Sequence, residues 1–135
     1  MSLARNIIRI LNEADNDDMV LSRIETCLTK TKGKILDLSK LGLTEIPQEV
    51  FKLTGLVELN LSNNRLSELP VEVFGLDKLK ELDISNNLFT NLPHEELIAM
   101  SMEDSLEILV ISGNKNIPKK TMNMLLRKLE TLIES

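Results

Sequence analysis

Hydrophobic residues return along this chain in one fixed order. The pattern Leu-x-x-Leu-x-Leu-x-x-Asn-x-Leu occupies residues 56–66, and it recurs without a gap 23 residues later at residues 79–89, with Ile and Phe at two of the leucine positions. The same template fits residues 33–43 and 106–116, which makes four units. Self-similarity at a period of about 20 to 50 residues indicates stacked repeats, each of which buries its apolar side against its neighbours.

Each of the first three units continues with an apolar residue and a proline. These pairs are Ile46-Pro47, Leu69-Pro70 and Leu92-Pro93. Proline fixes φ and lacks an N–H donor, so it suits the point where the chain leaves one turn for the outer side of the stack. The third unit is four residues longer than the others, since it runs 27 residues from Leu79 to Leu106.

The segments KILDLSKLGLTEIPQEVFKLTG and LVELNLSNNRLSELPVEVFGLDK resemble the intracellular leucine-rich-repeat family, in the variety that has Leu-Pro after the asparagine and repeats of about 23 residues. The resemblance covers about residues 33–118. It implies an α/β fold, a short right-handed leucine-rich-repeat solenoid with parallel strands on the concave face and helical N- and C-terminal caps. Two departures matter: Leu41 replaces the expected asparagine of the first unit, and the fourth unit loses the pattern after Asn114, with Asn116 where an apolar residue belongs.

Each unit predicts a short strand whose side chains alternate between two faces. Positions four and six enter the core, while positions three and five face outward. The outward residues, which we call the strand face, are Ile35, Asp37, Glu58, Asn60, Glu81, Asp83, Ile108 and Val110. A serine column borders them at Ser39, Ser62, Ser85 and Ser112. We predict that a partner binds the strand face, because its acidic centre invites a basic segment. The alternative is a merely solvated surface.

The asparagines Asn64, Asn87 and Asn114 are predicted to be structural. An asparagine side chain offers amide donors and a carbonyl acceptor, which can satisfy main-chain groups exposed where the chain turns out of a strand.

The flanks predict caps, because an open solenoid exposes its core at both ends. We expect a single domain over residues 1–135: a helical N-terminal cap (1–32), four repeats (33–118) and a C-terminal capping helix (119–135). The first stretch of the N-terminal cap has helical spacing at Leu3, Ile7, Ile10, Leu11 and Ala14, and the second at Val20, Leu21, Ile24 and Leu28. The C-terminal stripe is Met122, Leu125, Leu126, Leu129, Leu132 and Ile133, which a docking or dimerisation helix would also fit.

Composition disfavours several classes of partner. The 135 residues include three Phe but no Trp or Tyr, so few side chains could stack on nucleic acid bases. The net charge of −5 repels phosphate backbones and anionic lipid. No apolar run is long enough for a transmembrane helix, and the first residues do not read as a signal peptide.

With Cys27 as the only cysteine, no internal disulfide can form, which favours a reducing, cytoplasmic location.

No residue set predicts catalysis, a cofactor or a metal. The acidic loop at residues 15–18 lacks the glycine and glutamate that an EF-hand needs, and the Gly33-Lys34 pair is followed by Ile35 rather than Ser or Thr, unlike a phosphate loop. His94 is the only histidine, and we expect it at the start of a surface helix. Cys27 is expected to be a buried structural thiol.

The leading hypothesis is therefore a monomeric protein-protein interaction module, such as an adaptor, that binds a protein or peptide through its repeats without catalysis. The alternative is a regulatory or targeting repeat fragment of a larger multidomain enzyme, of GTPase or ubiquitin ligase type. A third is a structural unit that self-associates through its terminal helix. We expect no nucleic acid and no membrane as partner.

Overall fold

A computed structural model of the chain describes residues 18–103, 106–128 and 133–134. Its elements, in chain order, are α2 (Asp18–Lys30), β1 (Ile35–Asp37), the 3₁₀ helix η1 (Gln48–Lys52), β2 (Glu58–Asn60), the 3₁₀ helix η2 (Val71–Gly75), β3 (Glu81–Asp83), α3 (His94–Glu103), β4 (Ile108–Val110), α4 (Lys119–Lys128) and β5 (Ile133–Glu134). None of the helices within these residues is both long and apolar enough to cross a lipid bilayer.

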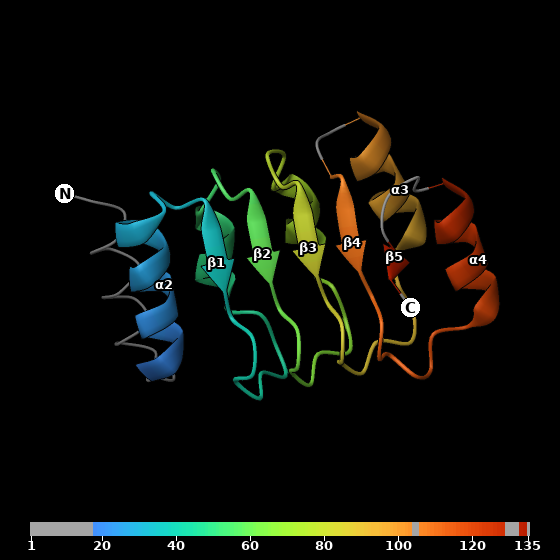
Figure 1. Cartoon of the computed structure of the whole chain (residues 1–135), viewed down its shortest axis with the longest axis horizontal. Helices are drawn as coiled ribbons and strands as arrows, with labels where there is room; N and C mark the ends of the chain where they lie inside the picture. The colour runs from blue at the N-terminus through green and yellow to red at the C-terminus, as the bar shows by residue number, and fades with distance from the viewer. Residues whose placement is uncertain (1–17, 104–105, 129–132, 135) are drawn as a thin grey trace.

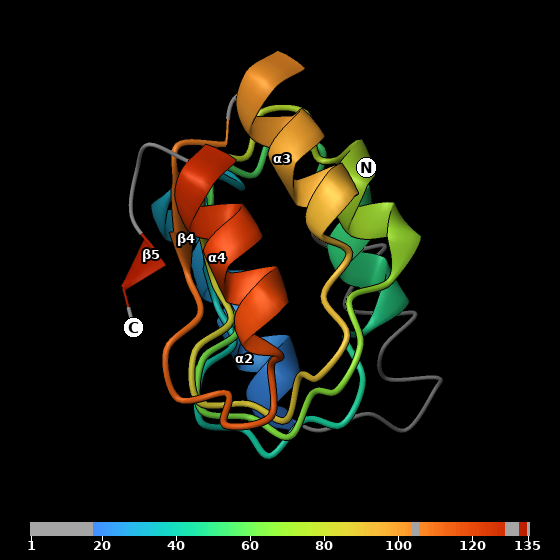
Figure 2. The ribbon, with the colours of Figure 1, turned by 90° about the vertical axis from the view of Figure 1, so that its right-hand side faces the viewer.

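The strands form one open parallel sheet in the order of the sequence, β1-β2-β3-β4-β5. Neighbouring strands pair in the register of the repeat, so Ile35 lies beside Glu58, Glu58 beside Glu81, and Glu81 beside Ile108. The strands line one side of the molecule, and η1, η2 and α3 lie on the other (Figures 1 and 2). This arrangement confirms the α/β repeat solenoid predicted from the periodicity.

The core lies between these two layers and is built from the repeating apolar positions. Positions four and six are fully buried in every unit, as Leu36, Leu38, Leu59, Leu61, Leu82, Ile84, Leu109 and Ile111. Burying a leucine or isoleucine side chain contributes about 1.5 to 3 kcal/mol, so the two columns supply much of the stabilisation that the stacked units need. The predicted inward direction of these positions is confirmed.

Each unit turns out of its strand through one residue in the left-handed conformation. That residue is Lys40, Asn63, Asn86 and Gly113 in successive units, with φ of 60°, 56°, 53° and 75°. Asn and Gly tolerate this region better than other residues do, so Lys40 is the least favourable of the four residues for this conformation.

The prolines mark the start of the outer helical segments. The main-chain oxygens of Pro47, Pro70 and Pro93 accept the N–H groups of Val50, Val73 and Leu97 in the first turns of η1, η2 and α3. The two shorter units make 3₁₀ helices of five residues, whereas the longer third unit makes α3, which has ten. The four additional residues therefore enlarge the outer layer and leave the sheet register unchanged.

Helix α2 covers the N-terminal end of the core. Its residues Val20, Ile24 and Cys27 are buried, and Leu21 and Leu28 pack against the same cluster, as their helical spacing predicted. Figure 1 shows α2 beside β1. The stretch of the predicted cap at Leu3, Ile7, Ile10, Leu11 and Ala14 lies outside the described residues.

The prediction that one helix runs from residue 119 to residue 135 is wrong. Helix α4 is described over Lys119–Lys128, whereas residues 133–134 form β5, which pairs in parallel with β4 through Leu109 with Ile133 and Val110 with Glu134. The apolar residues near the end fit a helical stripe by spacing alone, but β4 would otherwise be an edge strand with unpaired main-chain groups. Pairing with that edge overrides the helical pattern.

Candidate functional site

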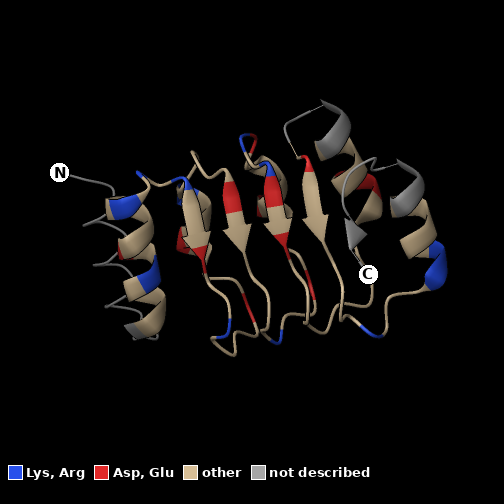
Figure 3. Ribbon diagram, viewed as in Figure 1, with Lys and Arg blue, Asp and Glu red and all other residues tan. Residues whose placement is uncertain are grey.

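The strand face points outward as predicted, and it has an acidic middle between apolar ends. Ile35 on β1 is 44% exposed, while Glu58, Glu81 and Ile108 are half-buried in the same row. Figure 3 shows the acidic colour concentrated on β2 and β3, with mainly uncharged ribbon on β4. The row of position three thus has carboxylates at its centre and aliphatic side chains at both ends, while the β1 edge also carries the exposed Asp37.

Glu58 and Glu81 form a like-charged pair across adjacent strands in register. Partial burial raises the pKa of the Glu81 carboxyl, and the nearby charges of Glu58 and Asp83 raise it further. No cation within the described residues forms an ion pair with Glu58 or Glu81. The pair is therefore a locally unfavourable arrangement that an added positive charge would relieve.

Asp37, in contrast, already has an internal partner. The Arg23 guanidinium of α2 lies 3.2 Å from the Asp37 carboxylate and donates a hydrogen bond of 2.9 Å to its main-chain oxygen. Burial pushes the pKa of Asp37 upward, but the hydrogen bonds from Ser39 and the charge of Arg23 outweigh it, so the pKa lies below its usual value. Asp37 thus contributes less free negative charge to the strand face than the sequence suggested.

The residues at position five of the first three units have a structural role that was not predicted from the sequence. The side-chain oxygens of Asp37, Asn60 and Asp83 each accept the N–H group two residues ahead at 2.9 Å. The two aspartates also accept the hydroxyl groups of Ser39 and Ser85 at 2.6 Å. The signal was present as an Asp/Asn-x-Ser sequence in three successive units, because such side chains commonly form local turns. Val110 ends this series.

The predicted structural role of the asparagines is confirmed. The amide of Asn87 donates to the main-chain oxygens of Leu61, Ile84 and Ser85 at 2.9 to 3.1 Å, and its oxygen accepts the N–H of Leu66 at 3.0 Å. Asn64 and Asn114 bridge to the preceding unit in the same way. The main-chain groups at each turn are therefore paired inside the scaffold, and these asparagines are not exposed to a partner.

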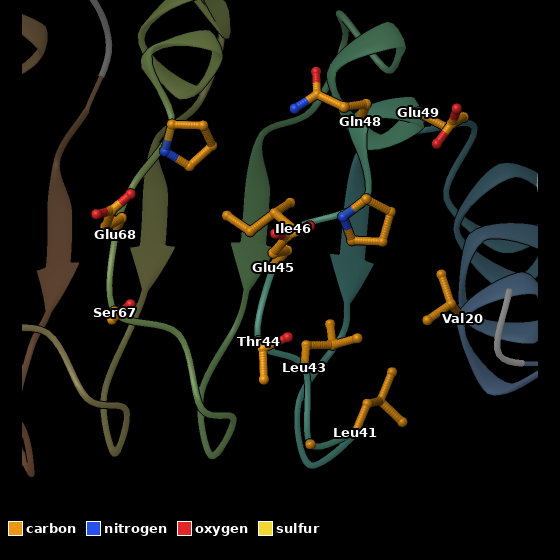
Figure 4. Close-up of a pocket in the computed structure, with 13 residues that line it drawn as sticks. Val20, Leu41, Leu43, Thr44, Glu45, Ile46, Gln48, Glu49, Ser67 and Glu68 are labelled. Carbon is orange, nitrogen blue, oxygen red and sulfur yellow. The ribbon is translucent and has the colours of Figure 1, made fainter.

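A second candidate is an open groove on the opposite side of the sheet, close to α2 (Figure 4). It has a volume of about 900 Å³ and is lined by Val20, Leu41, Gly42, Leu43, Thr44, Glu45, Ile46, Pro47, Gln48, Glu49, Ser67, Glu68 and Pro70. The groove could not be predicted from the sequence, because it depends on how α2 packs beside the first two units. Leu41, at the position where later units have asparagine, is part of its wall.

The residues considered for chemistry, Cys27 and His94, belong neither to the strand face nor to the lining of the groove. Cys27 is 1% exposed, and burial raises the pKa of its thiol despite hydrogen bonds that lower it. The predicted burial of Cys27 is therefore confirmed, and a thiol in such surroundings is usually unreactive. His94 begins α3, followed by Glu95 and Glu96. The described part of the chain contains no group of three or more His, Cys, Asp or Glu residues placed to hold a metal ion.

Comparison with known proteins agrees with this architecture. A family model described as leucine rich repeat matches residues 34–89 and 54–115. The solved structure of a leucine-rich-repeat protein from Leptospira interrogans is similar, with 32% sequence identity and a TM-score of 0.63; the similarity covers 75% of this chain and 25% of that one. This chain thus spans about a quarter of the length of the Leptospira interrogans protein. The comparison with curated proteins found no match. With the family model matching more than half of its residues, the chain belongs to the leucine-rich-repeat family.

Proposed function

We propose that this chain is a protein-interaction module that binds a Lys- or Arg-bearing protein segment through the strand face and catalyses no reaction. One observation carries the proposal: Glu58 and Glu81 lie side by side at the centre of the exposed sheet face, with no cation of the described residues paired to either. A basic side chain placed there would remove the repulsion between the two carboxylates and gain a charge-assisted contact.

The dimensions of the face limit the kind of partner. Strands lie about 4.8 Å apart, so the four strands that carry the strand face span only about 15 Å. That width fits one extended segment or one helix rather than a broad domain surface. Stable interfaces usually bury about 800 Å² on each partner, so a segment bound here alone should have modest affinity and charge should act mainly on the association rate.

The test is an affinity capture with mass spectrometry, using the whole chain as bait. Three baits are compared: the unchanged chain, the double variant Glu58→Lys with Glu81→Lys, and the control Glu45→Lys with Glu49→Lys on the opposite side of the sheet. We expect the same partner with the unchanged bait and the control, and its loss with the strand-face variant. Loss with the control variant alone would move the binding site to the groove of Figure 4.

A second candidate function is that of a regulatory or targeting repeat segment within a longer enzyme, of GTPase or ubiquitin ligase type. Its basis is limited to length: the similar Leptospira interrogans repeat protein extends well beyond the part that this chain matches. An antibody raised against this chain distinguishes the two on an immunoblot of the source cells. A band at the mass of the isolated chain supports the free-standing adaptor, and a much larger band supports the fragment.

We also propose a monomer in the cytoplasm. The single, buried Cys27 has no intramolecular partner for a disulfide, which suits a reducing compartment. Sedimentation velocity at several concentrations tests the oligomeric state, because self-association through the terminal helix would make the sedimentation coefficient rise with concentration. Cell fractionation with the same antibody tests the location.

A further inference from the structure

We propose that the strand face recognises an extended peptide segment with the order apolar-x-basic-x-apolar, lying across the strands. The inference rests on the proposed function and adds to it the order and conformation of the bound residues. The juxtaposition that carries it is the row formed by position three of four successive units, in which the paired acids Glu58 and Glu81 stand between Ile35 and Ile108.

The row is continuous because the strands are in register. Ile35 is paired with Glu58, Glu58 with Glu81, and Glu81 with Ile108, so the four side chains follow one line across the sheet. Three steps of about 4.8 Å separate the two isoleucines by about 14 Å. The point midway between the two glutamates lies about 7 Å from either isoleucine. The row therefore presents three sites at equal intervals: apolar, acidic, apolar.

An extended segment matches these intervals. It advances about 3.4 Å per residue, and alternate side chains point to the same side, so residues two apart present side chains about 7 Å apart and residues four apart about 14 Å apart. A helix rises about 1.5 Å per residue and needs nine residues to span the same 14 Å, by which point the side chain points to the opposite side. The spacing of the row thus favours an extended occupant.

The chemistry of each site follows from its residues. Ile35 is one of the exposed large hydrophobic residues of the described chain, and Ile108 lies half-buried beside Val110 on the same strand. Covering these side chains removes apolar surface from water, which favours an aliphatic residue at each end of the segment. A single guanidinium can donate to both carboxylates at once, so arginine suits the centre better than lysine does.

The acidic centre alone would attract any cation, but the apolar ends make the order of residues matter. Two synthetic peptides of equal composition test this directly: Thr-Leu-Thr-Arg-Thr-Leu-Thr, which carries the proposed order, and Leu-Leu-Thr-Thr-Thr-Thr-Arg, which does not. Both have blocked ends, so their charge is the same. The whole chain is labelled at its isoleucine methyl groups, and each peptide is titrated while the NMR signals are followed.

With the ordered peptide we expect the methyl signals of Ile35 and Ile108 to shift together, while that of Ile46, on the opposite side of the sheet, stays in place. The shuffled peptide should bind more weakly by about threefold to tenfold, the effect of losing one or two small contacts. The variant Glu58→Gln with Glu81→Gln should weaken binding of the ordered peptide, and the matched control Glu45→Gln with Glu49→Gln should not.

The possible failures are distinguishable. Equal shifts of Ile35 and Ile108 with both peptides would overturn the proposed order while leaving the strand face as the binding surface. Shifts of Ile46 instead, or no shift at either row position with any peptide, would overturn the order and remove support from the proposed function as well. Transferred nuclear Overhauser effects that show a helical bound peptide would contradict the extended conformation.

Discussion

Arg23 and Asp37 join helix α2 to strand β1 by two contacts, an ion pair of 3.2 Å and a hydrogen bond of 2.9 Å to the main-chain oxygen of Asp37. The side chain of Arg23 is 28% exposed and that of Asp37 is 56% exposed, so water screens the ion pair. The hydrogen bond to the main chain adds to the apolar packing of Val20, Ile24 and Cys27 that holds α2 against the end of the sheet.

Arg23→Ala should lower the free energy of unfolding by about 0.5 to 1 kcal/mol, because it removes a partly exposed ion pair together with one hydrogen bond. The pKa of Asp37 is lowered in the folded chain, so the carboxylate stabilises the fold above its unfolded pKa and loses this contribution as the pH falls through the folded value. Urea unfolding of both proteins measures this: the difference between them should shrink in acid. If the stability difference between the two proteins did not change with pH, it could not come from the ion pair of Arg23 and Asp37.

The ionised Glu81 side chain should lower the stability of the fold, whereas ionised Asp37 raises it. The pKa of Glu81 is raised in the folded chain by burial and by the charges of Glu58 and Asp83. A raised carboxyl pKa means that the ionised form destabilises the fold above the folded pKa, and that this cost disappears as the pH falls to the unfolded value. Glu81→Gln should therefore stabilise the unbound chain at neutral pH by a few tenths of a kcal/mol and change little in acid. A destabilised Glu81→Gln variant at neutral pH would show that the pair is not repulsive.

Asn87→Ala should cost about 1 to 3 kcal/mol of stability, because it leaves the main-chain groups that Asn87 pairs between two units buried without partners. Thermal unfolding followed by circular dichroism measures the effect. Asn91→Ala, at an exposed position of the same unit, serves as the control and should be nearly neutral. If Asn87→Ala kept full stability but lost partner binding, its structural role would be refuted.

Lys40→Gly should stabilise the chain by about 0.5 to 1 kcal/mol, since Lys40 adopts the left-handed conformation with φ of 60° in a turn where the fourth unit has glycine. The reverse change, Gly113→Ala, should destabilise it, because the added Cβ would overlap the side chain of Asn86. Chemical unfolding of both variants tests the pair of expectations. A less stable Lys40→Gly variant would mean that the lysine side chain makes a contact worth more than the strain.

The repeat period predicted the sheet and its register, since a leucine in the wrong register would face water. It also predicted which residues form the strand face, because alternation leaves no choice once Leu36 and Leu38 are inside. It did not predict the pairing of Arg23 with Asp37, because that contact joins elements whose relative placement depends on packing. The spacing of apolar residues also did not predict β5. The position of Ile133 is compatible with either a helix or a strand, and the strand forms because it pairs with the open edge of β4.

The most direct test of the account is the salt dependence of association with the captured partner, measured by stopped flow or surface plasmon resonance. For the unchanged chain, the association rate should fall as ionic strength rises, because the acidic centre at Glu58 and Glu81 attracts the partner from a distance that salt screens. Glu58→Lys with Glu81→Lys should slow association at low salt and flatten or reverse that dependence, while thermal unfolding remains cooperative. Unchanged affinity and an unchanged salt dependence in this variant would contradict the claim that the strand face is the binding site.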